Sequence, residues 1–370
     1  MKFAPAAEGA THHSAVHLGD SVGANLPLPQ DWGRGCRPQA AGVRAASRGG
    51  WATGMSLRSA DRPTPLISVI VVNWNGRHWL EGCLGSLAVQ TYPRVEVVLV
   101  DNGSTDGSVA FVRERYPAVR TIEAGENLGF IGGNNLALAH ARGELLAFLN
   151  NDTVCDREWL AALAAAVEPP DVAGATGKVY ALDEPERPVF TLPLVGRYSA
   201  RARWTADDYP PCDVHYLAGN NMLIKRRVIE EIGPLDADYE AYFEETDWCA
   251  RMIMAGYRVV YAPAAKIWHK ELGSTSLAAN RSYMERNRIR FALKNFDPPY
   301  LALFVPLYLA DAARRFWRGH DSAGVPLRPI ILRAIWWNLR HLPRTLQARR
   351  RDLGRLPRRR SYNRSLASYR

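Results

Sequence analysis

The sequence predicts an α/β fold with a mainly parallel central sheet, because strand-like and helix-like segments alternate from Pro65 onward. Residues 66–72 (LISVIVV) and 95–100 (VEVVLV) are continuous apolar runs rich in β-branched residues, as expected of strands buried on both faces of a sheet. Between them, leucines recur at helical spacing over residues 80–87. Strands that alternate with helices on short connections form βαβ units.

The same alternation continues to about residue 170. We expect a helix from Ser108 to Arg115, a third strand at 118–124, a helix from Asn134 to Ala141, a fourth strand at 145–149 and a helix-like segment opening at Asp156. Beyond Asp171 the strand signals become less regular, which predicts a mixed second half of the same domain.

Composition divides the chain into three parts. Residues 1–62 are rich in Ala, Gly, Arg and Pro without sustained periodicity, so we expect them to be disordered, and Met55 could be the true start. We assign residues 63–280 to the folded domain. Residues 281–370 hold 21 Lys and Arg against 5 Asp and Glu, whereas the whole chain has a net charge of +10. The basic character therefore belongs to a C-terminal helical extension.

Three interpretations of this extension remain open. It could be a helical appendage that packs on the core, or a set of amphipathic helices lying on an anionic membrane, which Trp317, Trp336 and Trp337 among regularly spaced arginines favour. A nucleic-acid module would instead give salt-sensitive binding to DNA or RNA. We expect the membrane surface as partner and no nucleic acid.

Localisation is predicted from cysteines and hydropathy. The five cysteines are scattered without a CxxC pair, which indicates a reducing compartment and no zinc site. No apolar run approaches the ~20 residues that a membrane-spanning helix needs. We therefore expect a cytoplasmic protein, peripheral on the inner face of the cell membrane.

Polar clusters end three of the predicted strands: VVNWNG at 71–76, VDNGSTDGS at 100–108 and LNNDT at 149–153. A turn after a strand explains one such cluster by local hydrogen bonding. Three clusters at the carboxyl ends of parallel strands predict a shared crevice for a polar ligand. The segment 125–135 (GENLGFIGGNN) adds glycines that let backbone approach a ligand. It matches neither G-x-G-x-x-G nor a P-loop, so a dehydrogenase-type nucleotide site is not expected.

In their order along the chain, six motifs resemble those of the family 2 glycosyltransferases, with the rhamnosyltransferase-like enzymes of bacterial surface polysaccharides as the most similar subgroup. The resemblance covers roughly residues 66–270 and rests on SVIVVNWNG, VDNGSTDGS, NLGFIGGNN, LNNDT, GNNMLIKR and YFEETDWCAR. It implies the GT-A fold, a nucleotide-binding α/β sandwich that holds a nucleoside-diphosphate sugar.

The resemblance also implies which residues bind the donor. Asp101 matches the aspartate that accepts a hydrogen bond from the pyrimidine ring, and Asn73 and Asn75 would flank the base and ribose. The remaining candidates for the nucleotide-sugar site are Asn127, Gly129, Asn134, Asn151 and Asn220. For Asn220 and its neighbour Asn221, a structural role at a strand edge is an equal alternative.

A divalent cation, Mg²⁺ or Mn²⁺, is the cofactor that the resemblance implies. Asp152 matches the last carboxylate of the family's D-x-D element, and His269 matches a histidine that completes the metal shell or touches the diphosphate. Asn150 stands where the strict pattern has its first Asp. A hard cation can still be held by one or two protein ligands together with diphosphate oxygens and water.

Catalysis is assigned by resemblance to the acidic segment 240–247. The family places its general base in the second member of an acidic pair, which falls here on Glu245, with Glu244 second and Asp247 as a supporting acid near the helix start. A sugar hydroxyl needs such a carboxylate to take its proton as the new bond forms. Acids interleaved with Tyr242, Phe243 and Trp248 cannot all face solvent.

The sequence therefore predicts a metal-dependent, inverting glycosyltransferase. It would move a sugar from a nucleoside-diphosphate donor to a hydroxyl of a cell-surface glycan or a lipid-linked acceptor. Rhamnose fits the subgroup, but the sequence encodes the donor sugar only weakly. The absence of Q-x-x-R-W after the acidic pair argues against a processive synthase. The alternative is a nucleotide-sugar-binding or scaffold protein of the same fold with impaired catalysis, which the Asn150 and Glu245 departures favour.

Overall fold

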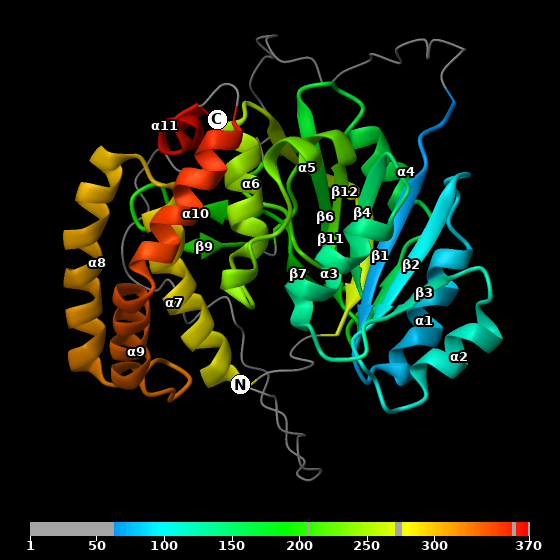
Figure 1. The fold of residues 1–370 in the computed structure, drawn as a ribbon, viewed down its shortest axis with the longest axis horizontal. Helices are drawn as coiled ribbons and strands as arrows, with labels where there is room; N and C mark the ends of the chain where they lie inside the picture. The colour runs from blue at the N-terminus through cyan, green and yellow to red at the C-terminus, as the bar shows by residue number, and fades with distance from the viewer. Residues whose placement is uncertain (1–62, 206, 271–275, 357–359, 369–370) are drawn as a thin grey trace.

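The computed structural model describes residues 63–205, 207–270, 276–356 and 360–368, so the expectation of disorder at 1–62 lies outside the described residues (Figure 1). The strands are β1 (Ile67–Asn73), β2 (Val95–Asp101), β3 (Arg120–Glu123), β4 (Leu145–Asn150), β5 (Thr153–Cys155), β6 (Val172–Ala181), β7 (Pro188–Phe190), β8 (Leu194–Val195), β9 (Ala202–Arg203), β10 (Cys212–Asp213), β11 (Asn221–Lys225) and β12 (Arg258–His269). The helices are α1 (Arg77–Ala88), α2 (Ser108–Arg115), α3 (Gly129–His140), α4 (Trp159–Ala166), α5 (Arg226–Ile232), the 3₁₀ turn η2 (Ala237–Tyr239), α6 (Glu244–Met254), α7 (Leu277–Asn295), α8 (Pro298–Arg318), α9 (Leu327–Arg340), α10 (Leu342–Arg355) and α11 (Tyr362–Ser368).

One large mixed sheet forms the centre of the molecule. Its strand order is β10-β12-β6-β11-β4-β1-β2-β3, with β5 paired to β12 and β7 to β6. β1 runs parallel to both β2 and β4, β2 runs parallel to β3, and β6 runs parallel to β12. β11 lies antiparallel between β4 and β6. The expected α/β fold with a mainly parallel sheet and an irregular second half is confirmed.

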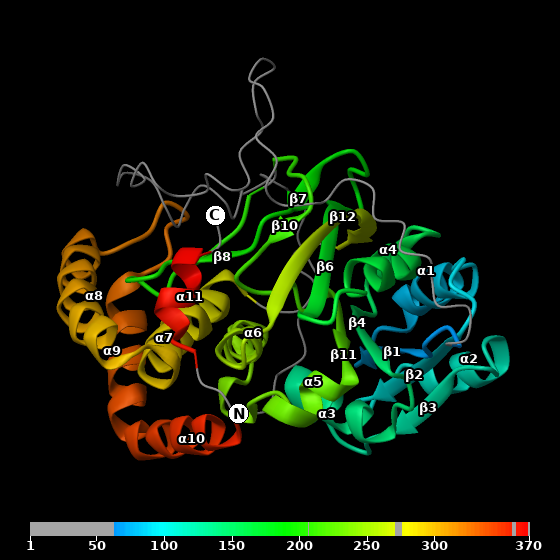
Figure 2. The ribbon, with the colours of Figure 1, turned by 90° about the horizontal axis from the view of Figure 1, so that it is seen from above.

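Helices cover both faces of the sheet, which explains the continuous apolar runs in its strands (Figure 2). In β1, Val69 and Val71 join a buried cluster with residues of α1 and α4, whereas Ile70 joins a second cluster with residues of α3, α5 and α6. Because successive side chains of a strand point to opposite faces, a strand covered on both sides needs apolar residues at nearly every position.

Most of the glycine-rich segment is helical. α3 begins at Gly129, five residues before the expected start at Asn134. A Cβ atom on Gly133 would lie 2.7 Å from the Val72 side chain, so glycine is needed there for α3 to approach β1 closely. The expectation that the glycines of residues 125–135 free backbone N–H groups for a ligand stays a prediction.

The C-terminal helices α7 to α11 pack beside α6 at one end of the molecule (Figures 1 and 2). The boundary that we expected at residue 280 falls within the first turns of α7. Two basic residues of α7, Arg290 and Lys294, are almost completely buried. None of the described helices combines the length and the apolar character that crossing a bilayer requires.

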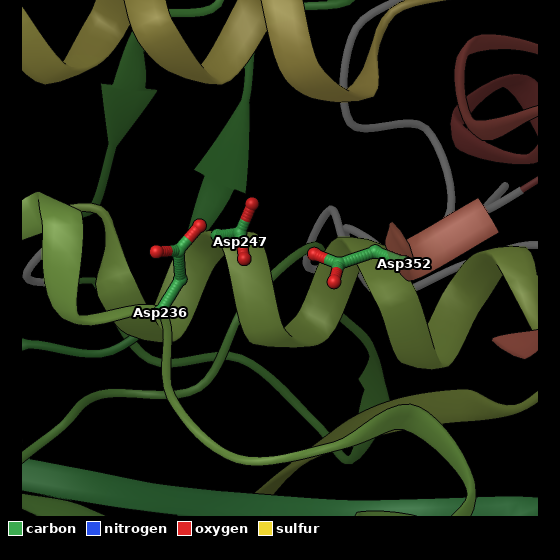
Figure 3. Close-up of side chains that lie close together, drawn as sticks. All are labelled: Asp236, Asp247 and Asp352. Atoms are coloured by element: carbon green, nitrogen blue, oxygen red, sulfur yellow. The ribbon is translucent and has the colours of Figure 1, made fainter. Parts of the chain in front are cut away.

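Asp236, Asp247 and Asp352 lie close together (Figure 3), and Lys294 connects the C-terminal helices to the sheet domain by pairing with all three. Its ammonium nitrogen lies 2.6 Å from Asp236, which precedes η2, and 2.8 Å from both Asp247 of α6 and Asp352 of α10. The three acids could together hold a metal ion, but the lysine already supplies the cation between them. Burial would raise the pKa of Asp236, yet the charges of Lys294 and Arg290 lower it below its usual value. We refer to Asp236, Asp247, Lys294 and Asp352 as the lysine cage.

Replacing Lys294 with Met is expected to destabilise the protein by about 3–5 kcal/mol, because three buried carboxylates lose their shared cation. The matched change Lys270→Met removes a lysine that pairs with the exposed Asp183, and a pair of that kind contributes about 1 kcal/mol or less. Urea denaturation followed by circular dichroism measures both effects. Equal losses for the two variants would contradict a stabilising role for the cage.

Candidate active site

Hydrogen bonds join the tips of β1, β2 and β4 into one polar network. Asn73 Nδ2 donates to Asp101 Oδ1 at 3.1 Å, and Asn151 Nδ2 donates to Asn73 Oδ1 at 2.7 Å. Asn73 and Asp101 are register partners at the ends of their parallel strands, and both are buried. Three of the expected nucleotide-site residues are therefore in mutual contact, as the shared edge of the strands requires.

Two local features fix the loops around this network. A Cβ atom on Gly76 would lie 2.1 Å from Asn151 Nδ2, so a larger residue there would displace the Asn151 amide from the network. Asn75 adopts a left-handed conformation with φ of 49°, and its Oδ1 accepts a hydrogen bond from Thr105 N at 2.8 Å. Ser104, which we did not single out from the sequence, accepts hydrogen bonds from Asn73 Nδ2 and Asn75 N. Its position within VDNGSTDGS, one of the polar clusters at the strand ends, could have identified it as a site residue.

A hollow of about 390 Å³ opens beside the network, within the size range of small-ligand pockets. Asp101 lines it together with the loop at 103–105, the start of α2 and Glu123 at the end of β3. Both Asp101 oxygens already accept protein hydrogen bonds, Oδ2 from Ser104 N at 2.8 Å. A carboxylate oxygen has a second lone pair, so Asp101 can still accept from a ligand.

The expected residues of the glycine-rich segment serve local structure. Asn127 Oδ1 accepts from Gly129 N at 2.8 Å, which satisfies an N–H at the start of α3. Asn134 is buried, and its amide donates to Phe130 O at 2.8 Å, one turn back along the same helix. The hydrogen bond of Asn134 therefore stays within α3 and does not reach the strand-tip network. The carbonyl of Gly129 accepts a hydrogen bond from Asn102, which follows β2.

Asp152 and His269 meet at the tip of β4. Asp152 Oδ1 lies 3.2 Å from His269 Nε2, because β5 pairs with the end of β12 and sets Thr153 opposite His269. Asn150 Nδ2 lies 3.3 Å from the same ring nitrogen. Asp152 Oδ1 is buried and accepts no well-oriented hydrogen bond. A carboxylate oxygen left without a donor beside an imidazole nitrogen is a ligand set that suits Mg²⁺ or Mn²⁺.

Glu244 and Glu245 are the first two residues of α6. Glu244 is buried, Glu245 is half-buried, and one oxygen of each carboxyl is buried without a hydrogen bond. Burial raises the pKa of Glu245 to about 7, and burial together with the neighbouring charge of Glu245 raises the pKa of Glu244 well above its usual value. The two carboxyls form a coupled pair that holds a proton near neutral pH.

Topology brings this pair to the same edge of the sheet as Asp152. α6 precedes the parallel strand β12 and packs against it, so its amino end lies at the edge where the parallel strands end. Asn221 pairs with Leu149, which sets the turn at 218–221 beside the tip of β4. Tyr216, just before that turn, lies close enough to Glu245 that burial and then this charge raise its pKa.

The other acid and the paired asparagines have structural partners. Asp247 is completely buried in the lysine cage and also accepts from Tyr239 and Asn295. It lies in the first turn of α6, where a supporting acid was expected, but its charge is neutralised inside the protein. Asn221 is buried and accepts from Trp159 Nε1 at 2.7 Å, which is the structural alternative. Asn220 is half-buried in the turn itself.

Comparison with known proteins agrees with this geometry. Residues 68–233 match the sequence model of Glycosyl transferase family 2. Among solved structures, the fold is similar to that of GalNAc-T7 with UDP, GalNAc and Mn²⁺ (TM-score 0.54, 16% identity, 66% of this chain and 50% of that one). It is also similar to the mannosyltransferase PcManGT from Pyrobaculum calidifontis in complex with GDP-Man and Mn²⁺ (TM-score 0.51, 21% identity, 82% and 86%).

Sequence relatives point the same way. The N-acetylglucosaminyl-diphospho-decaprenol L-rhamnosyltransferase of Mycobacterium tuberculosis is 29% identical over 248 residues, which span 57% of this chain and 78% of the relative. The O-antigen biosynthesis protein RfbC of Myxococcus xanthus is 26% identical over 232 residues, or 59% of this chain and 18% of the relative. The protein is a glycosyltransferase with the GT-A type of fold. Residues 68–233 form the part of the chain that is similar to glycosyltransferase family 2.

Replacing Glu245 with Gln is expected to stabilise the protein at alkaline pH. The pKa of Glu245 is raised from 4.5 to about 7 in the folded state, so its contribution to stability is complete below pH 4.5 and lost as the pH rises through 7. Glutamine carries no charge to lose. The melting temperatures of variant and wild type should therefore converge near pH 4.5, with the variant higher at pH 8. The exposed Glu114→Gln is the control, and a difference that does not change with pH would contradict this account.

Proposed function

We propose that the protein catalyses metal-dependent transfer of a sugar from a nucleoside-diphosphate donor to a glycan hydroxyl, with inversion at the anomeric carbon. The observation that carries this proposal is the buried oxygen of Asp152, which faces His269 without a hydrogen-bond donor at the edge where α6 begins. A metal ligand and a pair of protonatable acids at one edge of the sheet suit a direct displacement, in which the acceptor attacks opposite the leaving diphosphate.

In this proposal Asp152 and His269 hold Mg²⁺ or Mn²⁺. The two similar structures are complexes with Mn²⁺ together with UDP or GDP-mannose, which supports a cation of this kind. The cation would neutralise the negative charge that develops on the diphosphate as it leaves. Asn150 has an amide where the strict pattern has a carboxylate. The protein would therefore supply fewer of the negative charges around the cation, and the diphosphate would supply a larger share.

Glu245 acts as the general base. Its carboxylate takes the proton of the attacking hydroxyl while Glu244 stays protonated beside it, because two adjacent buried carboxyls cannot both ionise easily. A base with a pKa near 7 is half-ionised at neutral pH, where both its availability and its basicity are useful. Tyr216 and Cys249 are the other titratable groups whose pKa responds to its charge.

The donor nucleotide binds at the hollow beside the strand-tip network. Asp101 accepts a hydrogen bond from the base, and Asn73, Asn75 and Asn151 orient the loops around the base and ribose. Asn220, in the turn beside β4, faces the sugar or the acceptor. The rhamnosyltransferase among the relatives supports rhamnose as the donor sugar and a lipid-diphosphate-linked saccharide as the acceptor.

Transfer of rhamnose from dTDP-rhamnose to a lipid-diphosphate-linked N-acetylglucosamine is the direct test, measured with and without Mn²⁺. We expect Glu245→Gln to lower kcat by about 10²–10⁴-fold while dTDP still binds. Asp152→Asn should lose activity and its response to Mn²⁺ together. Asp156→Asn, whose carboxylate only accepts from Glu158 N before α4, is the control. Donor binding without turnover for several nucleotide sugars would favour the alternative, a binding or scaffold protein of the same fold.

A lipid-linked acceptor requires access to a membrane, and α8 has a surface suited to it. Between residues 302 and 310, only Phe304 and Tyr308 are buried, and every exposed position is apolar: Ala302, Leu303, Val305, Pro306, Leu307, Leu309 and Ala310. Exposed helix faces in water are normally polar. Trp317 is 78% exposed at the end of α8, between Arg314 and Arg318, which are also exposed.

We infer that α8 and α9 lie on the anionic inner face of the cell membrane. α9 adds Trp336, which is 67% exposed, and the exposed Arg333 and Arg340. Tryptophan enters the interface between headgroups and acyl chains, while arginine pairs with lipid phosphates. Trp337 is not part of this surface, because its ring stacks on His341 and lies against Arg286.

Flotation with liposomes tests the membrane surface. Wild-type protein should float with vesicles containing phosphatidylglycerol, and binding should weaken as salt rises. The double variant Trp317→Ser and Trp336→Ser should lose at least tenfold in affinity. Val89→Ser removes an exposed apolar residue at the end of α1, on the sheet domain, and should bind like wild type. Equal flotation of both variants would exclude this surface, and salt-sensitive binding to DNA without flotation would favour the nucleic-acid interpretation.

A further inference from the structure

The four residues before α6 have an unusual backbone. Glu240, Tyr242 and Phe243 have φ values of 63°, 64° and 73°, and none of them is glycine. A bulky residue in the left-handed region is strained and persists only where its surroundings impose it. Three such residues within four positions directly precede Glu244 and Glu245. We call residues 240–243 the strained loop.

Asn287 of α7 donates hydrogen bonds to the strained loop and to the residue before it. Asn287 is completely buried, and its Nδ2 atom lies 2.9 Å from Tyr239 O, 2.7 Å from Ala241 O and 2.8 Å from Tyr242 O. An amide group has only two protons to share among these three carbonyls. Carbonyl oxygens repel one another, so the loop can turn all three toward one point only while a donor occupies that point.

Arg286 fixes the orientation of this amide. Its Nε donates to Asn287 Oδ1 at 2.9 Å, and because arginine has no acceptor atoms, the amide nitrogen must face the loop. The same guanidinium donates to Tyr239 O at 2.6 Å and pairs with Glu240. The Cζ atom of Arg286 lies 4.6 Å from the centre of the Trp337 ring. The Asn287 amide is thus fixed at both ends, its oxygen by Arg286 and its nitrogen by the backbone carbonyls.

The strained loop determines where the acid pair points. Phe243 is the residue from which α6 starts, and its carbonyl accepts the first hydrogen bond of the helix, from Asp247 N at 2.8 Å. Its ring packs on Phe291 of α7, with ring centres 5.6 Å apart. A loop relaxed to negative φ would rotate the first turn of α6 and carry the Glu244 and Glu245 carboxyls away from their buried positions.

We propose that Asn287 is a positioning residue for catalysis, which holds the strained loop so that Glu244 and Glu245 face the reaction centre as a buried pair. This inference rests on the proposed role of Glu245 as the base. It gives the C-terminal helices a part in the reaction, because the donor of the three hydrogen bonds lies on α7, outside the segment that matches the family model.

The test compares Asn287→Ala with Asn363→Ala in the full-length protein. Asn363 is an equally buried asparagine of α11 that donates to Arg197 O and accepts from Asp297 N, far along the chain from the strained loop. Four quantities are measured: kcat, KM for the donor, the pH dependence of kcat, and hydrogen exchange of the amides at 240–248. We expect Asn287→Ala to lower kcat about 10²-fold with KM changed less than threefold, and to speed exchange in this segment. The rise of kcat with pH should move from about 7 toward 4.5.

A second change separates positioning from folding. Glycine adopts positive φ readily, so adding Tyr242→Gly to Asn287→Ala should recover at least tenfold in kcat. The proposal is overturned if both asparagine variants lose kcat equally, if the pH profile of Asn287→Ala does not move, or if Tyr242→Gly recovers nothing. Full activity of Glu245→Gln would instead refute the assigned base, and faster exchange at 240–248 in Asn287→Ala would then still support the hold on the loop.

Discussion

A buried lysine surrounded by three carboxylates is the interaction on which the rest of the molecule depends. Lys294 of α7 contacts Asp236, Asp247 and Asp352, which come from the loop before η2, from α6 and from α10. Buried charges are tolerated only when they are neutralised at close range, so these four segments cannot separate without exposing the network to water or leaving charges unpaired. Arg251 and Arg290 extend the same network to either side.

Asp247 of the lysine cage lies two residues from Glu245, so α6 carries both a stabilising ion pair and the proposed catalytic acids. Asp247 anchors α6 from within, while Glu244 and Glu245, at its amino end, keep unpaired carboxyl oxygens. These similar side chains have different roles because their surroundings differ. Asp247 is anchored by the charge of Lys294, whereas burial raises the pKa of Glu244 and Glu245. At the tip of β4, Asp152 likewise keeps an oxygen free beside His269.

Local patterns in the sequence predicted the sheet well and the tertiary contacts poorly. The β-branched runs became β1 and β2, the helix expected at Ser108–Arg115 appears with those bounds, and polar strand ends do meet at one edge. Within the glycine-rich segment, the sequence could not distinguish Gly133, which is needed for close packing of α3 on Val72, from a glycine needed for a ligand. The partners of Asp247 could not be predicted, since Lys294 lies 47 residues away and no periodicity records that pairing.

The order of these residues along the chain has a consequence for biosynthesis. Asp236 and Asp247 are synthesised before Lys294, and Asp352 follows it. Until α7 has been synthesised, burying Asp236 and Asp247 would mean burying anions without the lysine that pairs with both, which is strongly unfavourable. The nascent sheet can form early from its own strands, but α6 can settle beside its lysine only after α7 has followed. A chain that stops before α7 would thus lack the buried ion pairs that hold the first turn of α6.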